Sequence, residues 1–69
     1  IRDIRLLNDK ISGSLLRDLK LPQDILMLSI KRNDEIILSH GYTRLLKEDI
    51  ITFLGSKNSL DKLTLRFDS

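Results

Sequence analysis

The chain of 69 residues has no cysteine and no tryptophan, and only one histidine, one proline, one tyrosine and two phenylalanines. Without thiols it is neither a disulfide-stapled secreted scaffold nor a zinc ribbon, and we expect no metal and no cofactor. No apolar run approaches the roughly 18 residues of a membrane-spanning helix. So few aromatic rings do not supply the stacking platforms of proteins that bind single-stranded nucleic acid.

The chain has the size of one small domain, residues 1–69, with an expected stability of only about 3–10 kcal/mol. This stability must come from a compact aliphatic core or from a partner subunit. The sequence begins at Ile1 without a methionine, a basic leader or an apolar leader. We therefore expect a fragment of a longer, intracellular protein.

The charge is nearly balanced, with 12 Lys+Arg against 10 Asp+Glu and a net charge of +2. Acids and bases alternate along the chain, and no cationic cluster exceeds Lys31-Arg32. Proteins that bind nucleic acid usually gather their cations on one face. We therefore expect a mixed, solvated surface and no nucleic-acid partner.

Two segments have helical spacing. The first has a short apolar stripe, formed by Leu15, Leu16 and Leu19. Ser12 or Ser14 is suited to cap this helix, and Pro22 requires that it end by Lys20. A second helix is expected over 57–63 behind a Ser56 cap, with Leu60 and Leu63 facing inward. Phe67 extends this stripe if the helix persists; otherwise Leu65 and Phe67 alternate in a short strand.

Strands are expected over residues 1–7, 25–30, 36–40 and 50–55, with a turn at 8–10. The order strand, helix, hairpin, strand, helix indicates an α+β fold. Its sheet is small and mostly antiparallel, with two helices on one face.

The hairpin turns at Asn33-Asp34, because Asn tolerates positive φ and two-residue loops are common in hairpins. This register pairs Arg32 with Glu35, Lys31 with Ile36, and Ile30 with Ile37. Continued further, it pairs Ser29 with Leu38, Leu28 with Ser39, and Met27 with His40.

Both faces of this hairpin are largely aliphatic, whereas a half-exposed sheet has one polar face. Strict alternation puts one apolar stripe on the face away from the helices: Ile25, Met27, Ile36 and Leu38. Soluble monomers avoid such a patch, so we expect a homodimer that packs through this sheet surface.

Motifs for catalysis are absent, and we expect no enzymatic activity. His40 has no recognisable nucleophile beside it, and we interpret it as structural or interfacial. Asp34-Glu35 and Glu48-Asp49 fit turns better than a cation site, and Asp49 is expected to tie down the turn before its strand. Arg32 is interpreted as a cross-strand partner of Glu35, with a role as an anion-binding group left open.

Three motifs together resemble the TrkA-C domains, also called RCK C-terminal domains. Residues 13–22, GSLLRDLKLP, are similar to the family's opening G-x-x-L-x-x-L-x-L-P. Residues 30–37, IKRNDEII, are similar to its hairpin I-x-R-x-G-x-x-I, and residues 41–50, GYTRLLKEDI, to G-x-T-x-L-x-x-G-D. The chain departs from the family where proline often stands at Ser39, glycine at Glu48, and a small or acidic residue at Tyr42.

The resemblance implies a cytoplasmic regulatory module of a protein in the bacterial inner or plasma membrane: a potassium uptake system, a cation–proton antiporter, or a chloride channel or exchanger. Such domains dimerise through the sheet, and some bind a small anionic nucleotide, cyclic di-AMP, between protomers. Carried onto this chain, the resemblance implies ligand contacts along the hairpin, at Ile30, Arg32, Ile36, Ile37, Leu38, Ser39 and His40. Two alternatives are a ligand-free structural dimerisation domain and the effector or dimerisation half of a transcription regulator.

Overall fold

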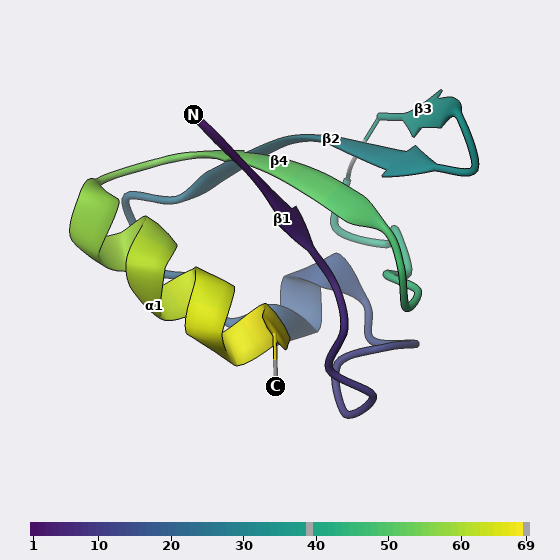
Figure 1. The fold of residues 1–69 in the computed structure, drawn as a ribbon, viewed down its shortest axis with the longest axis horizontal. Helices are drawn as coiled ribbons and strands as arrows, with labels where there is room; N and C mark the ends of the chain where they lie inside the picture. Colours follow the sequence, from purple (N-terminus) through teal and green to yellow (C-terminus); the bar gives the residue numbers. More distant parts are fainter. Residues whose placement is uncertain (39, 69) are drawn as a thin grey trace.

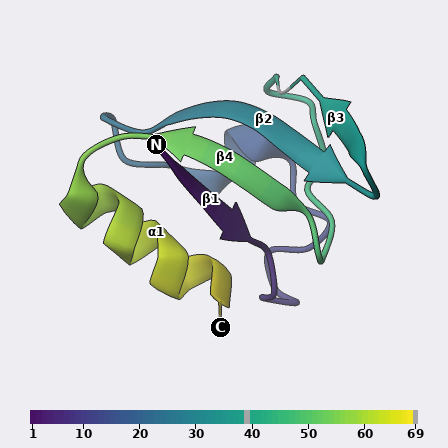
Figure 2. The ribbon, with the colours of Figure 1, turned by 45° about the horizontal axis from the view of Figure 1, so that its top comes forward.

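The computed structural model describes residues 1–38 and 40–68 and contains four strands, a short 3₁₀ helix and one α-helix. The elements are β1 (Arg2–Arg5), the 3₁₀ helix (Leu16–Leu19), β2 (Leu26–Arg32), β3 (Glu35–Ile37), β4 (Ile50–Leu54) and α1 (Lys57–Asp68). All strand pairs are antiparallel, and the spatial order is β1-β4-β2-β3. Both helices lie on the same side of this sheet (Figures 1 and 2), which confirms the predicted α+β class.

The core fills the space between the sheet and α1. Leu60, Leu63 and Phe67 form the buried stripe of the helix, as predicted, and the helix persists through Phe67. The alternative of a terminal strand through Leu65 and Phe67 is therefore wrong. Phe67 meets Phe53 of β4 edge to face at 5.7 Å between ring centroids, an arrangement that aromatic pairs favour.

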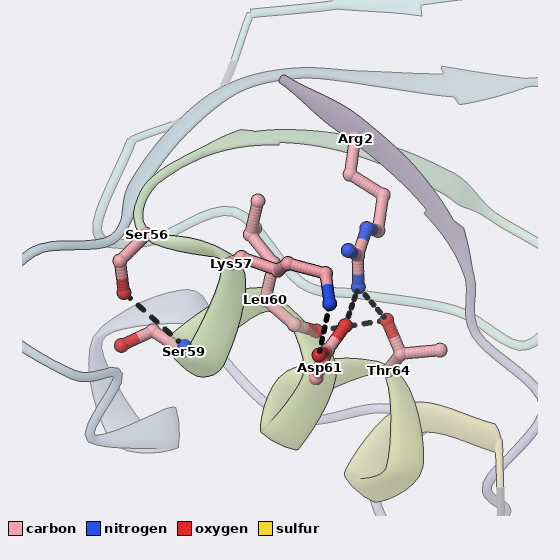
Figure 3. Close-up of polar contacts among 7 residues, drawn as sticks. All are labelled: Arg2, Ser56, Lys57, Ser59, Leu60, Asp61 and Thr64. Atoms are coloured by element: carbon pink, nitrogen blue, oxygen red, sulfur yellow. Dashed lines mark hydrogen bonds and ion pairs between the residues drawn. The ribbon is translucent and has the colours of Figure 1, made fainter.

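The N-terminus of α1 is capped as the sequence predicts, because the Oγ of Ser56 accepts the backbone N–H of Ser59 at 3.2 Å. The Asp24 carboxylate accepts hydrogen bonds from Ser56 and Ser59, which hold the pKa of Asp24 below its ordinary value. Figure 3 shows a second attachment of the helix, where Arg2 of β1 donates to Asp61 at 2.8 Å. Hydrogen bonds thus join the start of the helix to Asp24 and its middle to Arg2 of β1.

The first predicted helix forms only a 3₁₀ turn, without the predicted serine cap. Its N-cap is Leu15, which makes no side-chain capping bond, and it ends at Lys20 in the left-handed region with φ 52°. The left-handed backbone at Lys20 stops the helix after four residues, too few for an α-helix, and Pro22 prevents it from resuming. The Oγ of Ser12 instead accepts the N–H of Lys47 at 2.9 Å.

The hairpin has the predicted register around its tip. Ile30 pairs with Ile37, Lys31 with Ile36, and Arg32 with Glu35. Asn33 and Asp34 both have positive φ, 49° and 68°, as a two-residue turn between twisted strands requires.

Beyond the tip, the longer pairing that we predicted is wrong, since β3 ends at Ile37 and neither Leu38 nor His40 continues the ladder. The predicted pair of Leu28 with Ser39 falls outside the described residues.

A β-bulge in β2 changes which side chains face outward. Met27 pairs with Phe53 and Ser29 with Thr52, so Leu28 is an extra residue in the ladder. The bulge reverses the alternation before it, and Ile25 and Met27 pack against the core. Their assignment to the outer face was therefore wrong. The large apolar side chains exposed on the strands are Leu26, Leu28, Ile36 and Leu54, and Leu38, directly after β3, is exposed as well.

Replacing Gly55 with alanine should destabilise the domain by about 1–3 kcal/mol, because the added Cβ would overpack the space that its neighbours already fill. A Cβ at Gly55 would lie 2.5 Å from Ile25 Cδ1 and 2.9 Å from the carbonyl oxygen of Asp24. Urea unfolding monitored by circular dichroism would measure the change in midpoint at constant m-value. Gly41→Ala is the control, since its Cβ would meet only Arg17 Cβ at 3.7 Å. Equal midpoints for both variants would contradict the steric argument.

Candidate functional site

The guanidinium of Arg32 is anchored on the carboxylate of Asp49. Nε and Nη2 of Arg32 lie 2.8 and 2.7 Å from the two carboxylate oxygens of Asp49, a bidentate arrangement. Asp49 is only 1% exposed. These hydrogen bonds raise the pKa of Arg32 above its ordinary value. Arg32 is the cross-strand partner of Glu35, as predicted, while its side chain binds Asp49.

Asp49 also organises the loop that precedes β4, as the sequence predicted. Its carboxylate accepts the backbone N–H of Leu46 at 2.8 Å, and Arg32 donates to the carbonyl of Arg44 at 3.0 Å. Glu48 adopts φ 78°, a left-handed backbone for which glycine is the favoured residue. This conformation gives a physical reason for the glycine that TrkA-C domains often carry here.

A shallow cavity of about 120 Å³ opens beside this ion pair, lined by Arg32, Asn33, Leu46, Lys47, Glu48 and Asp49. Both cations in its lining are already neutralised. Arg32 is held by Asp49, and Lys47 lies 2.9 Å from Asp9, whose carboxylate raises the pKa of Lys47. These carboxylates, together with Glu48 in the lining, repel an anion, so the cavity does not favour one. Within residues 1–38 and 40–68, no three His, Asp or Glu side chains come together as a metal site.

Three of the residues expected to contact a ligand are exposed near the end of β3. Ile36 is 64% exposed and Leu38 is 79% exposed, while His40 lies on the surface beyond them. Since β3 is an edge strand, its free side has no neighbouring strand among the described residues. Ile36 and Leu38 therefore form an exposed apolar edge.

The other expected contacts are placed differently. Ile30 is 0% exposed and belongs to the core, and Ile37 is half-buried against that core. Arg32 is held by Asp49. Ser39 lies outside the described residues.

Sequence reasoning missed a surface group that we call the Arg17–Tyr42 cluster, formed by Arg17, His40 and Tyr42. The guanidinium carbon of Arg17 lies 4.7 Å from the centroid of the Tyr42 ring, in a cation–π contact. Nδ1 of His40 accepts the backbone N–H of Tyr42 at 3.2 Å. The departure at Tyr42 was noted in the sequence, but nothing there placed Arg17 beside it.

We predict that Arg32→Gln lowers the free energy of unfolding by about 3 kcal/mol, since it leaves the buried Asp49 carboxylate without its partner. Urea unfolding measures the loss, and Arg5→Gln, at an exposed arginine of β1, is the matched control. In a double-mutant cycle, Asp49→Asn should cost much less in the Arg32→Gln background than in the wild type. Additive effects of the two substitutions would show that the pair is not coupled.

We predict that neutral His40 carries its proton on Nε2, because Nδ1 is occupied as an acceptor. The chain has one histidine, so its two ¹⁵N resonances can be assigned without ambiguity. In the neutral imidazole, Nδ1 should resonate as an unprotonated ring nitrogen. The reverse pattern, with Nε2 unprotonated, would rule out the hydrogen bond to Tyr42.

None of the helices described is both long and apolar enough to cross a bilayer. A protein of Dichelobacter nodosus (strain VCS1703A), named "Putative transport protein", is 36% identical to the chain over 67 residues. The match covers 91% of this chain, which spans only 12% of the length of that relative.

Two solved structures share the fold. The first, "Structure of RCK domain with cda", is 33% identical with a TM-score of 0.91, and the match covers 96% of this chain and 94% of that one. The second, "RCK_C domain dimer of S.agalactiae BusR in complex with c-di-AMP", is 17% identical with a TM-score of 0.84, covering 97% and 93%. A sequence profile of the TrkA-C domain matches residues 1–68. The chain therefore belongs to the TrkA-C domain family.

Proposed function

We propose that the chain is a cytoplasmic, ligand-sensing regulatory domain of a bacterial membrane transport protein, and that it acts as a homodimer. In this proposal cyclic di-AMP binds between two protomers, beside the exposed end of β3. The occupied cleft favours one relative orientation of the protomers, and this bias is passed to the attached transport protein. A ligand has this effect only if it binds one arrangement more tightly than the other.

The observation that carries this proposal is the exposed apolar edge at β3. Ile36 and Leu38 are among the most exposed large apolar side chains of the chain. Ile36 lies on β3, an edge strand only three residues long, and Leu38 follows directly after it, so both stand at a sheet edge that another chain can pair with or cover. An apolar edge covered by a second copy leaves His40 close to the seam, where it can donate to a phosphate.

The names of similar proteins support the proposal, although they describe the ligands of those proteins and not the ligand of this chain. One similar protein is named for transport, and one structure with this fold is a dimer in complex with c-di-AMP. A host that transports potassium, chloride or a cation in exchange for protons is part of the same proposal. So are the placement of the host in the inner or plasma membrane and the absence of enzymatic activity.

The experiment combines the mass of the chain with its affinity for cyclic di-AMP. Sedimentation equilibrium should give about twice the 8.0 kDa chain mass, and Ile36→Lys with Leu38→Lys should shift the chain to a monomer. Leu65→Lys, at an exposed position of α1, should leave the dimer intact. Calorimetric titration with cyclic di-AMP should give heat with the dimer and much less with the edge variant.

A dimer that gives no heat with millimolar cyclic di-AMP would exclude that ligand and favour the ligand-free structural domain. A monomer at all accessible concentrations would exclude the proposed cleft. A fused DNA-binding domain in the longer protein, in place of transmembrane helices, would favour the effector half of a transcription regulator.

A further inference from the structure

The Arg17–Tyr42 cluster is an exposed group of three chemically different side chains. Tyr42 is 69% exposed although Arg17 lies over one face of its ring, so much of the aromatic side chain is open to solvent. The His40 ring lies 6.4 Å from the tyrosine ring, between centroids, and is tilted by 55°. A cation, an imidazole and an exposed aromatic ring are therefore presented together.

Backbone hydrogen bonds hold this cluster in place. The N–H of Arg17 donates to the carbonyl of Gly41 at 3.1 Å, and the N–H of Leu16 donates to the carbonyl of Thr43 at 2.9 Å. Within the turn, the N–H of His40 donates to Thr43 Oγ1 at 3.0 Å, and the N–H of Thr43 donates to the carbonyl of His40 at 2.9 Å. The two segments that carry the cluster are thus fixed to each other before any ligand arrives, which lowers the entropic cost of binding.

The charge of the cluster is only weakly compensated. Arg17 Nε lies 3.9 Å from Asp18 Oδ1, and both side chains are more than half exposed. Because Nδ1 of His40 accepts the Tyr42 amide, Nε2 is the ring nitrogen left to donate to a ligand. Two donors can thus reach a phosphate while the tyrosine ring offers a surface for stacking. Nucleotides present this combination of phosphate and planar base.

We propose that the Arg17–Tyr42 cluster contacts the nucleotide ligand, with the ring of Tyr42 stacked on a purine base and Arg17 and His40 on a phosphate. This inference rests on the proposed function and adds contacts from outside the hairpin. The cluster therefore sets how tightly the ligand is held.

The test uses the fact that the chain contains one tyrosine and no tryptophan. Tyrosine fluorescence therefore reports on Tyr42 alone, while calorimetry on the same samples reports on binding anywhere in the chain. Cyclic di-AMP should change the Tyr42 emission in proportion to the heat released. Tyr42→Leu should weaken binding about 5- to 150-fold through loss of stacking, whereas Tyr42→Phe should stay within about threefold of the wild type. Arg17→Gln should weaken binding about tenfold, and Lys62→Gln, an equal loss of charge on α1, should leave it unchanged.

The outcomes separate this inference from the proposed function. Heat without a change in Tyr42 emission, or wild-type affinity in Tyr42→Leu and Arg17→Gln, would overturn the inference and leave the proposed ligand in place. Equal losses in Tyr42→Leu and Tyr42→Phe would overturn the stacking. No heat with the wild-type chain would remove the ligand, and this inference with it.

Discussion

The ion pair between Arg32 and Asp49 fixes the loop before β4 to the end of β2. Arg32 is the last residue of β2 and Asp49 directly precedes β4, so this part-buried contact adds a side-chain link where the two strands already pair through Lys31 and Ile50. The same two side chains hold Leu46 and Arg44 of the intervening loop. A lone carboxylate as deeply buried as Asp49 is strongly unfavourable, which makes this one arrangement of the loop far better than its alternatives.

Local signals in the sequence were enough to predict α1 and the tip of the hairpin. The Ser56 cap, the stripe ending at Phe67 and the Asn33-Asp34 turn each depend on residues close in sequence. The bulge at Leu28 could not be predicted in this way, because it is set by the fit of β2 against β4. The length of the first helix was overestimated, because a leucine stripe does not reveal the left-handed backbone at Lys20.

In the candidate site, too, local sequence predicts some residues, and only the fold brings the others together. Ile36, Leu38 and His40 follow from the position of the hairpin and are exposed as a site requires. The contact between Arg17 and Tyr42 joins residues far apart in the chain, so only the folded structure reveals it. Likewise, no sequence signal showed that Asp49 would hold the guanidinium of Arg32.

The position of β1 has a consequence for the order of folding. Its ladder partner is β4, and the backbone just after it donates to the carbonyl of Phe67, near the other end of the chain. The native partners of β1 therefore lie far along the chain, in β4 and α1. Contacts of such long sequence separation close slowly and late. We therefore expect β1 to join the sheet late, after the folding nucleus has formed from β2, β3 and β4.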